Sequence, residues 1–146
     1  MAIGLEMYRR QREEEKRREE MREELNEVRK ECEILVRTHE NQRFMRVYVL
    51  MALDRIIHEL AYRRSLGSAE VSVEEEDDSK YIEITVQNRE MTQTDVREIL
   101  ERNVREEYTF NLVKALSFVD DFVIEPAPDG GVQLTAQKEL NTEVID

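Results

Sequence analysis

The stretch AEVSVEEEDDSKYIEITVQ, residues 69–87, decides the fold class. Apolar and polar residues alternate from Ala69 to Glu74 and again from Tyr81 to Gln87, and a two-residue period is typical of strands with one buried face. The polar link 75–80 between them is turn-like. We therefore predict an antiparallel hairpin with one face in the core and one wet, acidic face.

A second hairpin is predicted near the C-terminus. Phe122–Ile124 forms one strand, the turn signal PAPDGG follows at 126–131, and residues 132–136 alternate as the return strand. Between the hairpins, Thr92 or Thr94 begins one helix and residues 107–118 form another.

The stretch before the first hairpin is helical. From Phe44 to Ala61, apolar residues occupy most of the helix circumference, which predicts burial of much of its surface. Thr38 or Asn41 caps this helix, or one helix continues through the polar gap 38–42. The expected fold class is α+β: helices packed on one face of a four-stranded, mainly antiparallel sheet, with an extended N-terminal helix.

Charge is spread unevenly along the chain. Residues 9–31 hold nine basic and nine acidic side chains, and Glu and Arg recur at helical spacings, which favours a self-supporting helix. The net charge of −12 therefore belongs to the remainder. We predict a charged helical arm at 1–33, a compact domain at 34–140 and a loose tail at 141–146.

An apolar seam lies toward the C-terminal end of the predicted arm. Its members follow one another at spacings of four, three, four and three residues, the a/d pattern of a short coiled coil, and they are Met21, Leu25, Val28, Cys32 and Leu35. A seam of two heptads needs a partner or its own domain to pack on. We interpret it as the site that binds a protein partner or a second copy, with the cysteine as a small buried hydrophobe.

Composition excludes several classes of protein. One cysteine allows no intramolecular disulfide and no cysteine-based zinc site. The acidic balance makes nucleic acid an unlikely partner of the domain. No apolar run approaches the ~20 residues that cross a bilayer, so no membrane contact is expected and a cytoplasmic or other soluble intracellular compartment is predicted.

The sequence shows no catalytic constellation. His39 and His58 have no metal-ligand spacing with each other or with Cys32. The acidic run 74–78 lacks the alternating ligands and central glycine of a calcium loop. We therefore predict no catalytic residue, no metal and no cofactor.

Three segments resemble the ATPase domain of the histidine-kinase-like (GHKL) family, in its anti-sigma-factor serine-kinase branch. VLMALDRIIHELAY (49–62) is similar to the helix with the family's Glu…Asn-Ala motif, KYIEITV (80–86) to the strand before the Asp-x-Gly loop, and residues 111–140 to the last helix and hairpin. The resemblance implies an α+β sheet-and-helix fold and, where the motifs persist, nucleotide binding.

The nucleotide motifs do not persist in this chain. The alignment places Ala52 and Ile56 at the catalytic Glu and the magnesium-binding Asn, and Gln87-Asn88-Arg89 at Asp-x-Gly. No glycine lies between Gly67 and Gly130, so a glycine-rich lid is absent. The resemblance therefore implies a degenerate relative without an ATP site.

These observations predict a non-enzymatic regulatory or assembly protein that binds a protein partner through its degenerate domain and helical arm. One alternative is a small accessory subunit with a purely structural role in a larger complex. A second alternative is a nucleotide-dependent anti-sigma-type kinase, or a phosphotransfer protein that uses His39.

Overall fold

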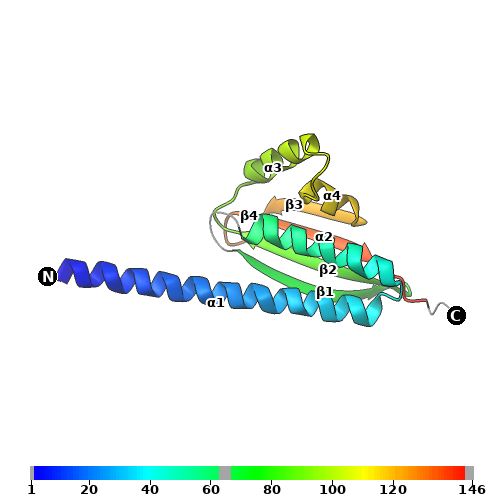
Figure 1. The fold of residues 1–146 in the computed structure, drawn as a ribbon, viewed down its shortest axis with the longest axis horizontal. Helices are drawn as coiled ribbons and strands as arrows, with labels where there is room; N and C mark the ends of the chain where they lie inside the picture. The colour runs from blue at the N-terminus through cyan, green and yellow to red at the C-terminus, as the bar shows by residue number, and fades with distance from the viewer. Residues whose placement is uncertain (1, 63–66, 144–146) are drawn as a thin grey trace.

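The computed structural model describes residues 2–62 and 67–143, and it consists of helices against one four-stranded sheet (Figure 1). The elements in chain order are α1 (Ala2–His39), α2 (Arg43–Ala61), β1 (Ser68–Glu76), β2 (Ser79–Asn88), α3 (Gln93–Arg105), α4 (Leu112–Ser117), β3 (Asp121–Pro126) and β4 (Val132–Glu139). The predicted α+β class and the extended N-terminal helix are confirmed.

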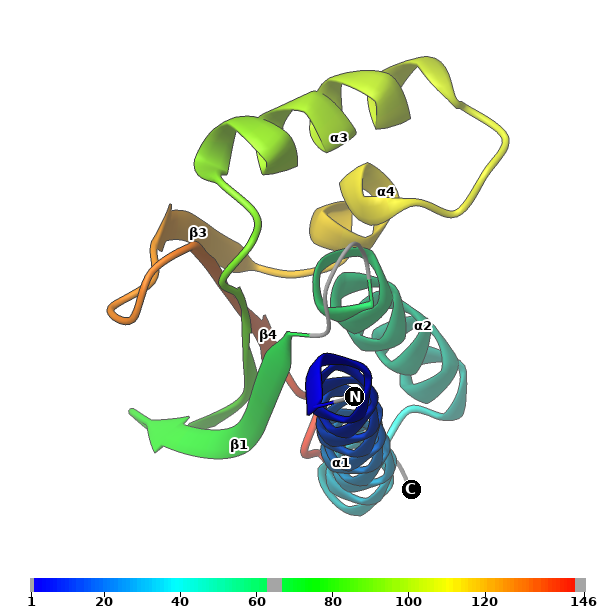
Figure 2. The same cartoon turned by 90° about the vertical axis from the view of Figure 1, so that its left-hand side faces the viewer.

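The sheet is built from the two predicted hairpins. All its pairs are antiparallel, in the order β1-β2-β4-β3, so the hairpins meet along β2 and β4. Ile82, Ile84 and Leu134 point into the core and are fully buried. Figure 2 shows the helices gathered on that side of the sheet.

The opposite sheet face is polar. Gln87 donates a hydrogen bond to Gln133 across β2 and β4 (2.6 Å), and the hydroxyls of Thr85 and Thr135 lie 3.4 Å apart. In the part of the chain that the structure describes, no helix covers this face (Figure 2). The wet face predicted from the alternation is therefore present.

The break between α1 and α2 differs from both proposed caps. Thr38 donates its hydroxyl back to the carbonyl of Ile34 (2.6 Å), and the side-chain amide of Asn41 donates to the carbonyl of Glu143. Gln42 occupies the N-cap position of α2 without a side-chain hydrogen bond. Both candidate caps were wrong, because each side chain is already engaged elsewhere.

A buried glutamate holds the C-terminal segment at this corner. The Glu40 carboxylate is fully buried and accepts two hydrogen bonds from Asn141, from the backbone N–H (2.9 Å) and from the side-chain amide (3.0 Å). The Asn41 N–H also donates to the carbonyl of Asn141. The tail predicted to be loose from residue 141 is anchored at its start, and residues 144–146 lie outside the described residues.

Side-chain N-caps determine where α3 and α4 begin. Thr92, not Thr94, begins α3 with a reciprocal pair of hydrogen bonds to Asp95. The helix predicted over 107–118 is shorter and begins after Asn111, whose side-chain amide donates to the carbonyl of Asn103 (3.0 Å). This buried asparagine contact stabilises a loop at 107–110, where apolar spacing alone favoured helix.

Among the described residues, no helix combines the length and apolar character needed to span a membrane.

Candidate partner-binding surface

The predicted partner seam lies inside the protein. Leu25 and Cys32 are 1% and 3% exposed, while Val28 and Leu35 are partly buried against the same core, and Met21 marks the start of this contact with partial burial. α1 lies beside α2 and β1 (Figure 2), and four of the seam side chains, Leu25, Val28, Cys32 and Leu35, belong to the core cluster or pack against it. The partner-binding role predicted for this seam is therefore replaced by packing within the chain.

This packing also moves the boundary of the arm. Every residue from Gly4 to Glu20 is exposed, whereas Leu25 to Val36 contributes to the core. The part of α1 that projects from the domain is about 25 Å long, at 1.5 Å per residue. The predicted division at residue 33 therefore falls within one continuous helix that belongs to the domain through its second half.

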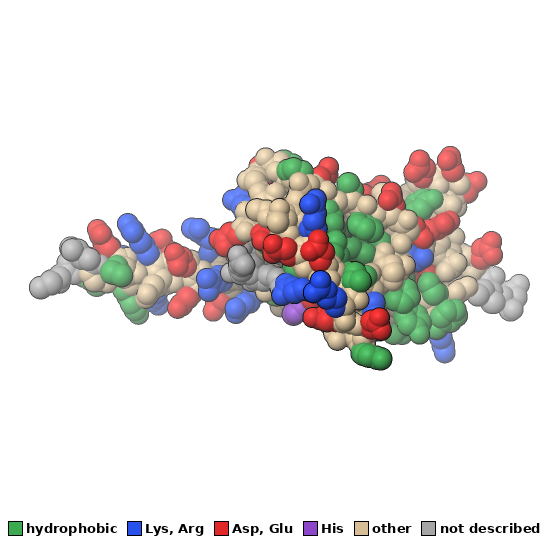
Figure 3. Space-filling model, turned by 90° about the horizontal axis from the view of Figure 1, so that it is seen from above, with side chains coloured by type: hydrophobic (Ala, Val, Ile, Leu, Met, Phe, Trp, Pro, Cys, Tyr) green, Lys and Arg blue, Asp and Glu red, His purple; other side chains and the backbone are tan. Residues whose placement is uncertain are grey.

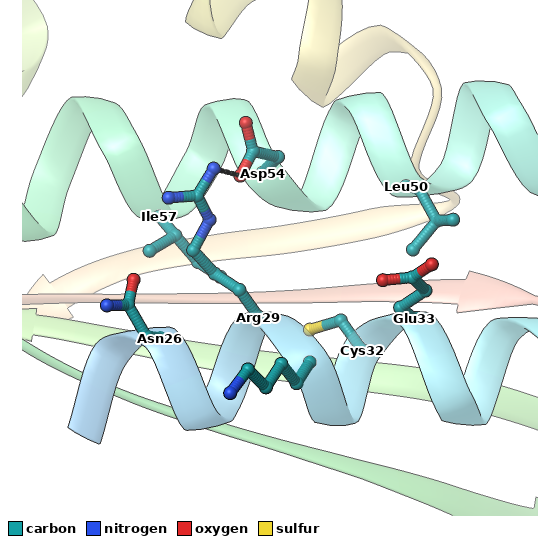
Figure 4. Close-up of a pocket in the computed structure, with 8 residues that line it drawn as sticks. Asn26, Arg29, Cys32, Glu33, Leu50, Asp54 and Ile57 are labelled. Atoms are coloured by element: carbon teal, nitrogen blue, oxygen red, sulfur yellow. Dashed lines mark ion pairs between the residues drawn. The ribbon is translucent and has the colours of Figure 1, made fainter. Parts of the chain in front are cut away.

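A hollow of about 420 Å³ lies between α1 and α2 (Figure 4). Arg29 reaches from α1 to Asp54 on α2, with 2.5 Å between the charged atoms, and closes part of it.

Burial, followed by the nearby carboxylates of Glu31 and Asp54, raises the pKa of the Cys32 thiol to about 12. The thiol is thus protonated at neutral pH and is a poor nucleophile, which confirms its interpretation as a small hydrophobe. Within the described residues, no three His, Cys, Asp or Glu side chains cluster as metal ligands.

The positions that the resemblance aligns with nucleotide ligands have other environments. Ala52 and Ile56 are buried in the core on α2, and neither side chain can bind a metal or a phosphate. Gln87 points to the uncovered sheet face, where its amide donates to Gln133. These side chains provide no nucleotide site.

The two histidines lie in different surroundings. His39 ends α1, is partly buried, and lines a shallow hollow between α1 and β1. His58 is exposed on α2 and stacks on Tyr62, with ring centroids 5.7 Å apart. The structure therefore does not bring the histidines together.

The first half of α2 exposes a large apolar stripe. Phe44, Val47, Tyr48 and Met51 follow helical spacings of three, one and three residues and are 63%, 57%, 44% and 42% exposed. Such a stripe lies along one side of a helix, and it is the pattern by which helices pack on other helices. In Figure 3, hydrophobic side chains gather along the lower right edge of the molecule, toward the end at which α2 begins in Figure 1.

Aromatic side chains on either side of α4 extend the stripe. The ring of Phe118, 36% exposed, stacks on Tyr48 with centroids 5.5 Å apart, and Phe110 lies 6.1 Å from Phe118. We name the combined surface the α2 ridge and define it by Phe44, Val47, Tyr48, Met51 and Phe118. Because the stacking joins two elements, the ridge is a preformed surface and not a set of isolated side chains.

Several ion pairs lie on α1 and α2. Arg29 and Asp54 form the ion pair between α1 and α2, Arg37 pairs with Glu33 along α1 at 2.7 Å, and Arg55 pairs with Glu59 along α2 at 3.6 Å. Closer to the ridge along α2, Arg43 is exposed and the Arg46 guanidinium donates to the backbone carbonyl of Glu40, so the side chains that flank its first turn are basic. The ridge itself is apolar and aromatic, in a chain with a net charge of −12.

Sequence reasoning missed this surface because it predicted that α2 was buried around most of its circumference. The signal was present: a helix that is apolar on nearly every side needs covering elements on nearly every side. In the described structure, α1, α4 and the sheet cover the arc that contains Leu53 and Ile57, and the arc of Phe44 and Met51 faces water.

No family model matches the chain, and no curated protein or solved structure matches it.

Proposed function

We propose that this chain is a non-enzymatic assembly or regulatory protein that binds a protein partner through the α2 ridge. The projecting part of α1 is a second, charged contact surface in this proposal. The function expected from the sequence is kept, while the binding surface moves from the seam of α1 to the exposed side of α2.

The exposed ridge carries the proposal. Soluble monomers rarely expose contiguous apolar patches larger than a few hundred Å², and the largest patch is often functional. Aromatic residues and methionine are enriched at the centres of protein interfaces, where charged residues are depleted. The ridge has this composition, with Phe44, Tyr48, Phe118 and Met51.

The exposed part of α1 supports the same kind of function. Between Arg9 and Glu20 its side chains are almost all charged and exposed, and the Arg12 guanidinium lies over the ring of Tyr8 on the same helix, 5.6 Å from its centroid. Leu5, Met7 and Tyr8 then expose apolar surface near its far end, at 59%, 60% and 56%. A charged helix with an apolar end resembles a spacer that holds a short contact away from the domain.

A photo-crosslinking experiment tests the proposal. A benzoylphenylalanine at Val47 in the full chain should give a discrete protein adduct in the cells that produce it, and Phe44→Ser should abolish the adduct. The matched control is the same probe at Val123, which is 49% exposed on β3 outside the ridge. Absence of an adduct at Val47, or identical adducts at both positions, would refute the proposal.

A further inference from the structure

The α2 ridge has the shape of a surface that pairs with itself. Its α2 members span Phe44 to Met51, about two helical turns, and the middle of the stripe lies between Val47 and Tyr48. In a twofold symmetric contact the same patch is used by both subunits. With the axis at the middle of the stripe and the helices antiparallel, Phe44 of one copy lies opposite Met51 of the other. Phenylalanine and methionine pack favourably on each other.

Charge favours the same contact. Each copy carries −12, so two copies repel unless they meet at a neutral surface. The five side chains of the ridge are themselves uncharged, and the nearest charged residues along α2, Arg43 and Arg46, are basic and add no carboxylate to the contact. The uncovered sheet face is a poor alternative, since Glu70, Glu83 and other carboxylates line it.

The available area is close to what a dimer needs. From the exposed fractions of the five ridge side chains and ~150–250 Å² per aromatic side chain, the ridge exposes roughly 450 Å² per copy. Two ridges therefore supply roughly 900 Å² before their flanking residues are counted, and a specific interface needs ~1,000 Å² or more.

We propose that the partner at the α2 ridge is a second copy of this chain, in a symmetric dimer with antiparallel α2 helices. The inference rests on the proposed function and names its partner. Because α1 runs antiparallel to α2 within each copy (Figure 1), the two projecting ends of α1 then extend from opposite ends of the dimer. Such a dimer can hold two contacts far apart.

Sedimentation equilibrium of the full chain tests the dimer. The wild-type protein should sediment at twice its 17.4 kDa, and Val47→Glu should sediment as a monomer. The control is Ile34→Glu: Ile34 is 63% exposed on α1, like Phe44 on α2, but lies outside the ridge. It should leave the dimer intact. Circular dichroism of each variant verifies that the helices are retained.

Cysteine cross-linking tests the symmetry without disturbing the charge. Val47→Cys places a thiol near the proposed twofold axis, so mild oxidation should give a disulfide-linked dimer, whereas Ile34→Cys should not. The native Cys32 does not interfere, because it is 3% exposed. A monomeric wild type, a dimer that survives Val47→Glu, or equal cross-linking at both positions would overturn the inference.

Failure of this inference is distinguishable from failure of the proposed function. A Val47 photo-adduct with the mass of a second copy supports both. An adduct with a different protein, together with a monomeric wild type, keeps the proposed function and refutes the dimer.

Discussion

Replacing Leu25 by alanine tests whether the second half of α1 belongs to the domain. Leu25 is 1% exposed and lies in the main core cluster, more than a full helical turn after the exposed stretch that ends at Glu20. If α1 were an independent arm from residue 1 to 33, this substitution would leave the stability of the domain unchanged. In the structure described above, it removes part of the core.

The magnitude follows from the burial of the side chain. Truncating a buried leucine to alanine costs the transfer free energy of the lost methyl and methylene groups and leaves a cavity, for a total of about 2–5 kcal/mol. Leu25 is almost fully buried between α1 and its neighbours, so we expect about 3 kcal/mol. Since 1.4 kcal/mol is a factor of ten, the unfolding equilibrium constant should rise roughly 150-fold.

Urea denaturation measures this change. The five tyrosines allow near-ultraviolet circular dichroism to follow tertiary structure, which is preferable to a helical signal because the projecting part of α1 contributes helix without a core. Leu5→Ala is the matched control, since Leu5 is 59% exposed on the same helix, and it should change the free energy of unfolding by less than about 0.5 kcal/mol. Equal, small effects of both substitutions would refute the placement of α1 in the core.

Substitution or treatment of three further residues has defined outcomes. Glu40→Ala removes the buried acceptor of two hydrogen bonds from Asn141 and should lower the free energy of unfolding by about 2 kcal/mol in urea titrations; an unchanged midpoint would contradict the described anchor. Cys32 should react slowly with iodoacetamide at pH 8 in the native protein and rapidly in urea, because its thiol stays protonated; fast native labelling would show that the site is open. Because the thiol pKa is raised to about 12 in the folded protein, the unfolded chain loses this proton at a lower pH, near the ordinary value of 9.0. The contribution of Cys32 to stability should therefore be complete below pH 9 and decline as the pH rises to about 12. Thr92→Ala removes the reciprocal contact with Asp95 and should cost about 1 kcal/mol, with faster amide exchange in the first turn of α3; unchanged exchange there would argue against the cap.

Local patterns were sufficient for much of the fold. The alternation at 69–87 predicted the first hairpin correctly, and the short apolar run 122–124, the turn signal at 126–131 and the alternation at 132–136 predicted the second. Thr92 was one of two proposed caps, and the choice between it and Thr94 needed the position of the first helical turn. The start of α4 was misjudged because the buried hydrogen bonds from the Asn111 side-chain amide to the Asn103 carbonyl, and from the Leu112 N–H to the Asn103 side chain, leave no periodic signal.

The candidate site was less predictable. The spacing from Met21 to Leu35 shows only that one side of the helix is apolar. It therefore predicts a coiled-coil seam whether that side packs on another chain or on the protein's own sheet. The ridge from Phe44 to Met51 reads as core for the same reason. Only the placement of α1, α4 and the sheet around α2 distinguishes the two apolar surfaces.

The amino-acid sequence by itself determined which segments are helical, which pair as hairpins, and that the charge-balanced stretch 9–31 is separate in character from the acidic remainder. Periodicity and charge are local properties, and they act before any tertiary contact forms. Tertiary structure decided which apolar surface is buried and which faces water. The reason is physical: burial of an apolar side depends on elements distant in sequence, so the seam at Leu25 and Cys32 became core while Phe44 and Met51 remained exposed.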